Sequence, residues 1–477
     1  MMNKLILVST IFLFNSMAFS QWAFNEVANN LQLSATLSVE IVDEKVIVGG
    51  VCGTTASQID HLNMIQSTDA GQTWAQPHTS TIGSEYLYTR NLHFFDDQVG
   101  LATCTAYPGY YAESSDDQFI IKTVDGGVTW NSVYQKDASH GFEAMSAMEF
   151  FDGTNGIVAG HFDDAGWFDI QPWMAVTSNG GDSWTDINLP AAMDGKEIKG
   201  MDIEGNAAYI LLQDGYDYVD INNSLSFYVY KSTDLGQTWT QISTMPFPQE
   251  YAIEDVLDGS SATDIDFGSA DVGYICFAEA KHKSYVYKTT DGGNTWSDIQ
   301  APLNSVSGHA NLDFNDIHFT SANEGFVAAG NYCDENACYR GYGVIYTADG
   351  GANWTVIGYD PNASFSFTKV DYDPTVGVGY IVGSGITSTN GRVFKLEHPN
   401  AGQEELDEIE FDMYPNPSNG VVYIDGLPEG EIVEILSLDG KKIKDVHSLN
   451  GSLEIVLDNG IYLVRSGSAT KKLTVTK

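Results

Sequence analysis

The sequence is poor in basic residues. It contains 22 Lys and Arg against 64 Asp and Glu in 477 residues, which gives a formal net charge of −42 at pH 7. Binding to nucleic-acid phosphates or to an anionic membrane surface relies on Lys and Arg, so the composition argues against both as partners. It favours a protein that works in salty surroundings, where ions screen its charge.

Long apolar runs are also missing. The run Leu5–Phe14 has only about ten residues and is too short to span a bilayer, and no later segment approaches the roughly 18 continuous apolar residues of a membrane-spanning helix. Lys4, this apolar run and the small residues of Ala18–Ser20 together have the pattern of a secretory signal peptide. We therefore predict a signal peptide over residues 1–20, Gln21 as the first mature residue, and no membrane-spanning segment after it. A retained N-terminal anchor is the alternative.

Five cysteines are too few for a disulfide scaffold. Cys333 and Cys338 flank four residues and are a candidate disulfide within one loop. Cys52 and Cys104 follow equivalent strands of neighbouring repeats and are a second candidate pair. Cys276 is then left over as a buried small residue. No CxxC pair occurs, so the sequence does not predict a zinc site.

Common catalytic motifs are absent from the sequence. It contains no HExxH, no GxSxG and no GxxxxGK[ST], and no segment has the EF-hand pattern. We predict no cofactor, although oxygen-rich loops leave Ca²⁺ open. His161 beside Asp163 and Asp164 is the one local cluster of histidine with acids, and it is more typical of a hydrogen-bonded loop histidine than of a ligand.

One octapeptide, S/T-x-D/N-x-G-x-T/S/N-W, recurs six times at intervals of 54 to 58 residues. A short acidic or amide side chain accepts hydrogen bonds from its own turn, and the glycine tolerates a positive φ. The closing tryptophan begins the next strand. We interpret these residues as structural: Asp69, Trp74, Asp125, Trp130, Asn179, Trp184, Asp234, Trp239, Asp291, Trp296, Asp349 and Trp354.

A second pattern lies between the octapeptides and consists of a short strand, a polar turn and a Gly-rich apolar strand. Leu92–Ala102 and Met148–Val158 are clear examples, and seven copies occur in all. Two hairpins per period give a four-stranded unit of about 55 residues, and residues 22–397 hold seven of them. Trp22 resembles the residue that closes each octapeptide, so the first strand is expected to complete the last unit and remove a free edge. An open or six-unit array is the alternative.

The octapeptides resemble the Asp-box, or BNR repeat, of sialidases, xyloglucanases, sortilin-type receptors and photosystem II assembly-factor-like proteins. This resemblance implies an all-β fold with a seven-bladed β-propeller over residues 21–397. It also implies that the octapeptides lie on the face opposite the usual binding site, so it is informative about fold and weak about function.

The C-terminal region is a separate module. Residues 398–410 read as an acidic linker, and residues 411–477 read as a small β-sandwich with a basic tail. Its motif residues are Tyr414, Pro415, Asn416, Pro417, Gly460, Tyr462, Lys471 and Lys472. They resemble the type IX secretion sorting domain of Bacteroidetes, which implies passage through the periplasm, export by the type IX machinery, and a secreted or cell-surface protein. An unrelated adhesive β-domain is the alternative.

Long predicted loops on one face of the propeller combine aromatic rings with carboxylates, a combination that suits sugars. The resemblance to sialidases adds the three arginines of the propeller, although the Arg-Ile-Pro signature of that family is absent near Trp22. The candidate ligand-binding residues are Tyr110, Tyr111, Asp163, Asp164, Trp167, Trp173, Tyr216, Tyr218, Arg90, Arg340 and Arg392.

These observations favour a propeller that binds an extracellular glycan or protein. The alternative is a glycan-cleaving hydrolase, sialidase-like or other, acting on the loop-rich face, and a scaffold protein is a third class. Two carboxylates about 5–10 Å apart in one pocket would favour the enzyme, whereas an aromatic face without such a pair would favour binding.

Overall fold

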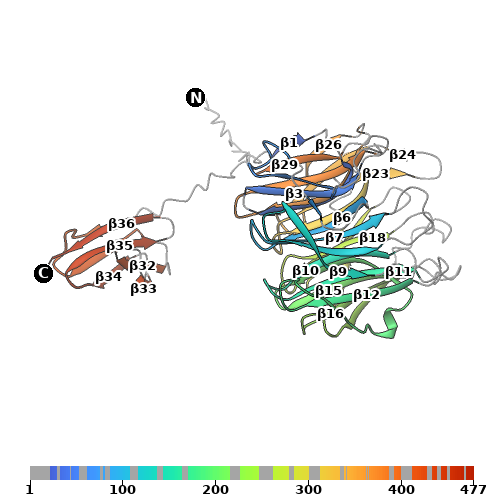
Figure 1. Cartoon of the computed structure of the whole chain (residues 1–477). Helices are drawn as coiled ribbons and strands as arrows, with labels where there is room; N and C mark the ends of the chain where they lie inside the picture. The colour runs from blue at the N-terminus through green and yellow to red at the C-terminus, as the bar shows by residue number, and fades with distance from the viewer. Residues whose placement is uncertain are drawn as a thin grey trace, which may run out of the picture. The chain divides into compact units, whose positions relative to one another are not determined.

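Figure 1 shows the computed structural model of the chain, which divides into two units, Met1–His398 and Pro399–Lys477. Apart from the 3₁₀ turn η1 (Ala191–Met193), every regular element in the described part is a strand. No helix in that part is long and apolar enough to cross a membrane. The structure describes residues 22–28, 33–42, 44–52, 62–75, 79–80, 86–107, 117–136, 143–163, 170–214, 226–246, 261–278, 284–299, 312–333, 338–339, 341–360, 363, 365–385, 391–398, 411–426, 432–437, 442–447, 452–466 and 469–476.

The described strands of the first unit form seven antiparallel sheets, numbered here along the chain. Sheet one contains β2 (Leu33–Val42), β3 (Lys45–Cys52) and β4 (Met64–Ser67). Sheet two contains β5 (Thr79–Ser80), β6 (Tyr86–Phe94), β7 (Gly100–Tyr107), β8 (Gln118–Thr123) and β9 (Thr129–Lys136). Sheet three contains β10 (Glu143–Phe150), β11 (Gly156–Asp163), β12 (Ile170–Thr177) and β13 (Thr185–Asp186). Sheet four contains β14 (Lys196–Glu204), β15 (Ala207–Asp214), β16 (Ser226–Ser232) and β17 (Thr240–Pro246). Sheet five contains β18 (Ser261–Phe267), β19 (Gly273–Ala278), β20 (Tyr285–Thr289) and β21 (Ser297–Asp298). Sheet six contains β22 (Leu312–Phe319), β23 (Gly325–Cys333), β24 (Cys338–Tyr339), β25 (Tyr342–Thr347) and β26 (Thr355–Asp360). Sheet seven contains β27 (Phe365–Asp373), β28 (Val378–Gly385), β29 (Arg392–Glu397) and β1 (Ala23–Ala28).

One strand of each sheet, which we call the inner strand, contacts the inner strand of the next sheet. The inner strands are β2, β6, β10, β14, β18, β22 and β27 in order, and β27 in turn contacts β2. The seven sheets therefore close into a ring, and this unit is a β-propeller. The N-terminal strand β1 pairs with β29 and so completes the sheet that contains the last strands of the ring.

The octapeptides form the turns that follow the third strand of a sheet. In the second one, the Asp125 carboxylate accepts hydrogen bonds from the backbone N–H and the hydroxyl of Thr129, at 2.8 and 2.6 Å. The Thr123 hydroxyl accepts the N–H of Gly127, whose φ of 88° is in the region that favours glycine. The Trp130 indole N–H donates to the carbonyl of Gly127 at 2.9 Å. Each turn thus satisfies its own backbone.

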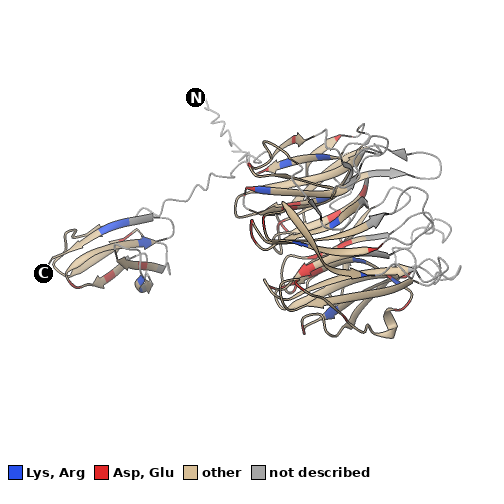
Figure 2. Cartoon of the chain, viewed as in Figure 1, with Lys and Arg blue, Asp and Glu red and all other residues tan. Residues whose placement is uncertain are grey.

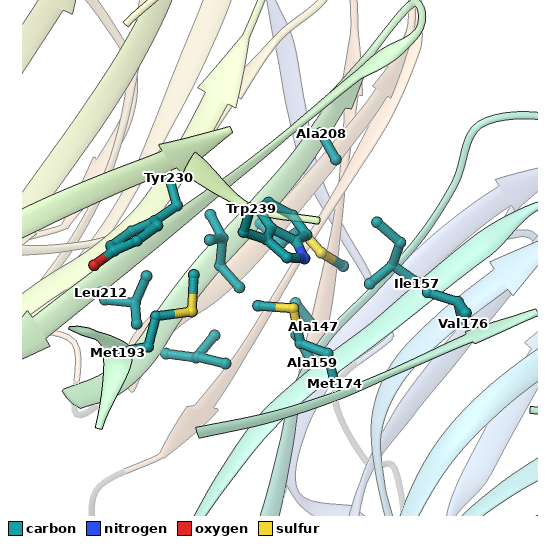
Figure 3. Packing of buried hydrophobic residues seen from close by; sticks show 13 residues of the cluster. Ala147, Ile157, Ala159, Met174, Val176, Met193, Ala208, Leu212, Tyr230 and Trp239 are labelled. Carbon is teal, nitrogen blue, oxygen red and sulfur yellow. The ribbon is translucent and has the colours of Figure 1, made fainter. Parts of the chain in front are cut away.

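The tryptophans of these turns pack between neighbouring sheets. Trp239 is 6% exposed, and its ring lies against Ile157 and Met174 of the third sheet and Ala208 of its own (Figure 3). Lysines add a second link between sheets: Lys288 Nζ donates to the carbonyl of Gly350 in the octapeptide turn of the next sheet at 2.7 Å. Each turn therefore contributes to inter-sheet packing as well as to its own hairpin.

The first sheet departs from the predicted four-stranded unit. In the described part it has three strands, and its outer edge is reduced to a bridge between Gln66 and Ala75. The strand β5 pairs in parallel with β9 of the second sheet instead.

The cysteines follow the prediction only in part. Cys276 is a buried free thiol, as expected. Cys104 is also free and buried, which corrects the proposed pairing with Cys52; its Sγ contacts the Thr89 hydroxyl at 3.8 Å. Cys333 and Cys338 occupy opposite positions of a β23–β24 pair, and their side chains lie outside the described part.

The second unit is a small β-sandwich. One sheet contains β30 (Asp412–Tyr414), β31 (Val421–Asp425) and β34 (Ser452–Val456), and the other contains β33 (Lys442–His447), β32 (Ile432–Ser437), β35 (Gly460–Ser466) and β36 (Ala469–Val475). Buried residues of both sheets, among them Val422, Ile455, Ile435 and Val464, share one core. The predicted all-β fold class, a propeller followed by a small sandwich, is confirmed.

Candidate functional site

The inner strands of the seven sheets line a cavity of about 510 Å³. Strands from all seven sheets contribute side chains to its wall, so the cavity follows the centre of the ring. Asp and Glu occur on strands throughout this unit, with Lys and Arg among them (Figure 2). Two layers of mostly polar residues line this cavity, one of them at a repeated strand position and the other at a repeated bulge.

The first layer is formed by one residue from each inner strand, and we call it the channel ring. Each member lies between two apolar residues, as Glu149 does between Met148 and Phe150. Alternation along a strand places the middle side chain on the face opposite to that of its two apolar neighbours. The members of the channel ring are Glu40, His93, Glu149, Asp202, Asp266, His318 and Asp371.

Most members of the channel ring bind the backbone of the following sheet. Glu40 accepts the N–H of Phe94 at 3.0 Å, and Asp202 accepts the N–H of Phe267 at 2.8 Å. Asp266 accepts the N–H of Phe319. The same relation links the seventh sheet to the first, where Asp371 accepts the N–H of Ile41 at 2.9 Å. His318 instead lies with its Nε2 3.4 Å from the carbonyl oxygen of Tyr372.

The second layer arises from a β-bulge at the same place in every inner strand. The bulged residue lies three positions before the channel-ring residue, as at Thr89/Asn91 in β6 and Ile198/Gly200 in β14, between which the register shifts. A bulge adds an unpaired residue and redirects its side chain. The bulged residues, all in the cavity wall, are Leu37, Arg90, Ser146, Lys199, Thr263, Asn315 and Thr368.

A lysine bridges two acids on one side of the cavity. Lys369 Nζ lies 2.6 Å from Asp316 Oδ1 and 3.1 Å from Asp264 Oδ2, and its side chain is 43% exposed. The other oxygen of Asp316 accepts the N–H of Val370 at 2.8 Å. Removal from water is the largest effect on Asp264 and raises the pKa of its carboxyl to about 7, against the attraction of Lys369.

Burial also governs the other acids of the cavity. It raises the pKa of Glu149 to about 8 and that of Asp266 to about 7, and neighbouring carboxyls add to both shifts. The pKa values of Glu40 and Asp202 are raised for the same reasons. Burial lowers the pKa of His93 to about 4, so this histidine is neutral at pH 7. At pH 7 Glu149 is therefore mostly protonated and can donate a hydrogen bond, whereas Asp264 and Asp266 titrate near neutral pH.

The predicted ligand residues divide into three groups. Arg90 does line the cavity, and its Nε donates to the Thr105 hydroxyl at 3.3 Å. Arg392 does not; it lies 3.6 Å from Glu26 and over the ring of Phe365. Side chains outside the described part are those of Tyr110, Tyr111, Asp163, Asp164, Trp167, Tyr216, Tyr218 and Arg340.

Trp173 requires a correction. It was predicted as a ligand-binding aromatic residue of a loop, but it belongs to β12 and is only 5% exposed. It packs against Tyr134 of the second sheet and under the ammonium group of Lys136. Its ring stabilises the contact between two sheets and is not available to a ligand.

His161 lies near charged residues that the sequence does not place beside it. Burial lowers its pKa to about 4, and Glu197, Lys199 and Arg90 act on it through their charges. Its Nδ1 is buried without a hydrogen-bond partner in the described part. Among the described residues, no three His, Cys, Asp or Glu side chains converge as a metal site.

Sequence reasoning missed the channel ring, although a signal for it was present. The recurring hairpin pattern has a titratable residue at one fixed position, visible as His93, Glu149, Asp266 and His318. Such a residue between two apolar ones in every copy indicates that these residues share one kind of environment. Only the tertiary structure shows that this environment is a single cavity lined by all seven inner strands.

The C-terminal unit carries its motif residues on adjoining strands. Asn416 Nδ2 donates to the carbonyl of Lys472 at 2.8 Å, and Asn416 Oδ1 accepts the N–H of Thr474 at 3.0 Å. Tyr414 and Tyr423 are exposed and stack at 5.9 Å. Residues 412–477 match the family described as secretion system C-terminal sorting domain. The C-terminal unit is a type IX secretion sorting domain. This sorting domain directs export, so the protein is secreted or displayed at the cell surface.

Comparisons for the rest of the chain concern the propeller. A 254-residue region, 49% of this chain, is 24% identical to Xyloglucanase Xgh74A of Acetivibrio thermocellus, and it covers 28% of that protein. The chain thus spans little more than a quarter of the length of the curated relatives that it matches. A solved structure of YCF48 bound to a D1 peptide is similar over 80% of this chain and 96% of its own, with 12% identity and a TM-score of 0.50. A polysaccharide lyase, the PL25 ulvan lyase, is similar over 78% of this chain and 94% of its own, with 10% identity and a TM-score of 0.49. These likenesses concern the fold.

Proposed function

We propose that the exported propeller, a seven-bladed Asp-box propeller made after removal of a signal peptide over residues 1–20, binds an extracellular ligand. The single observation that carries this proposal is the central cavity. Its volume of about 510 Å³ is within the roughly 300–1,000 Å³ of small-ligand sites. Polar side chains from all seven sheets converge on it, although closure of the ring uses only part of them.

A glycan is the ligand class that we favour. Protonated acids and hydroxyl groups in the cavity offer both donors and acceptors, which match sugar hydroxyls. The similarity to a xyloglucanase supports a glycan, whereas the fold likeness to YCF48 bound to a D1 peptide supports a protein partner.

Cleavage of a glycan is the second candidate. Asp264 and Asp316 lie against the same ammonium group, so the cavity does contain carboxyls close to each other. Retaining glycosidases hold their two carboxyl groups about 5–5.5 Å apart. However, Lys369 binds both acids, and Asp316 also accepts a backbone N–H, so neither acid is positioned as a free base. This arrangement favours binding over hydrolysis.

A glycan array with the purified mature chain tests the proposal, with and without Ca²⁺. The same glycans are then incubated with the protein and analysed for shortened products. We expect binding without turnover. Turnover would support the hydrolase instead, and binding to no glycan would redirect the search to protein partners.

A further inference from the structure

Glu149 differs from the other acids of the channel ring. Glu40, Asp202, Asp266 and Asp371 each accept a backbone N–H of the following sheet. In the part of the chain that the structure describes, the Glu149 carboxyl makes no hydrogen bond. It therefore contributes no hydrogen bond to closure of the ring at the junction between the third and fourth sheets.

The position of Glu149 nevertheless brings its carboxyl to the cavity. It interacts through its charge with Asp202, Asp264 and Lys369, which all line the cavity wall. Glu149 belongs to the same wall, with Ser146 at the bulge of its own strand. A carboxyl removed from bulk water gains from a partner that supplies both a donor and an acceptor.

We infer that Glu149 is the ligand-contacting carboxyl of the cavity and that it binds a hydroxyl group of a neutral glycan. This inference rests on the proposed function. A neutral sugar suits the site better than an acidic one because the channel ring holds five carboxyls and the whole chain carries a net charge of −42. Burial raises the pKa of Glu149 and of Asp266 because the site disfavours negative charge, and it would disfavour a sugar carboxylate for the same reason.

The test compares three variants of the mature full-length chain at pH 6.5. The probes are xyloglucan heptasaccharide, cellohexaose and chitohexaose as neutral sugars, with oligogalacturonate as the acidic comparator. We expect Glu149→Ala to lose at least about tenfold in affinity for the neutral sugar that binds best, a common loss when one hydrogen bond to a buried group is removed. Glu149→Gln should stay within about threefold, since an amide also offers a donor and an acceptor.

Glu40→Ala is the matched control, because it makes the same change at the equivalent position of another sheet. It removes the bond to Phe94 and should lower the melting temperature, which gives the size of the effect expected for a residue that closes the ring. Glu149→Ala should not lower the melting temperature. Calorimetric titration and thermal melts give the two readouts.

Each outcome separates the two proposals. If the unaltered chain binds a neutral sugar and Glu149→Ala binds it equally well, the role of Glu149 is refuted while glycan binding stands. A drop in melting temperature for Glu149→Ala as large as that for Glu40→Ala would make it a closing residue and overturn the inference. Binding of oligogalacturonate alone would overturn the neutral class, and binding of no sugar would reject glycan binding and this inference with it.

Discussion

The Asp371 carboxylate accepts a hydrogen bond of 2.9 Å from the backbone N–H of Ile41, a residue 330 positions earlier in the chain. This bond joins the last inner strand to the first. It is the same relation that Glu40 makes with Phe94 and Asp202 makes with Phe267 between consecutive sheets. The closing junction of the propeller therefore uses the interaction that also links its neighbouring sheets.

Replacing Asp371 by Ala should lower the free energy of unfolding by about 1–3 kcal/mol, because the Ile41 N–H is left without its acceptor. Asp371→Asn keeps an acceptor oxygen and should cost less. Thermal or urea unfolding of both variants measures the difference. Equal stability of the Ala variant and the unaltered chain would show that this bond does not hold the ring closed.

Trp239→Ala should lower the free energy of unfolding by roughly 3–5 kcal/mol, since it opens a cavity between the third and fourth sheets. Val124→Ala is a suitable control because Val124 is 66% exposed and should change stability little. Urea denaturation of the two variants tests the placement. A midpoint for Trp239→Ala equal to that of the control would contradict burial of this ring.

Asp291→Asn should lower the melting temperature only slightly, because Asn179 performs the same role in the third sheet and accepts the N–H of Ser183 at 3.1 Å, although an amide lacks the charge of the carboxylate. Asp291→Ala should lower it, since the Thr295 N–H and hydroxyl lose their acceptor. Differential scanning calorimetry at pH 7 compares them. Hydrogen bonds from Thr295 lower the pKa of Asp291 to about 2, so its contribution is present above about pH 4 and disappears as the pH falls toward 2.

Glu149→Gln should become more stable relative to the unaltered chain as the pH rises. Burial raises the pKa of Glu149 from its ordinary 4.5 to about 8, so the native state holds this proton more tightly than the unfolded state does. The stability that protonation provides is complete below pH 4.5 and is lost as the pH rises to about 8. Melting temperatures at pH 5 and pH 9 test this; a difference between the two proteins that does not change with pH would refute the shifted pKa.

Deleting Gly460–Lys477 should trap the protein in the periplasm. The deletion removes β35 and β36, so the sandwich loses two of the four strands of one sheet and part of its core, including Val464 and Leu473. Fractionation of cells that express the full chain and the truncation measures export. Undiminished export of the truncated chain would show that these strands are not required for sorting.

Sequence patterns predicted much of the fold because each repeat is a local unit. The octapeptide encodes its own turn through contacts four residues apart, such as Thr129 to Asp125, and these can be read from one short segment. The sorting domain was predictable for a similar reason, since its motif is continuous. The candidate site was less predictable: among the described side chains, Arg90 lines the cavity, whereas Trp173 proved to be a core residue.

The sequence by itself determined the repeat, its strand content, the turn chemistry and the export signal, because these depend on residues close together in the chain. Only the tertiary structure decided the environment of Glu149, Asp371 and Lys369. Their hydrogen bonds, or the absence of them, depend on strands 50 or more residues away, and their protonation depends on burial in a cavity that exists only when the ring closes. The spacing of residues in the sequence does not show which strands meet in the cavity. It therefore could not show that, among the described carboxyls of the channel ring, Glu149 makes no hydrogen bond that closes the ring.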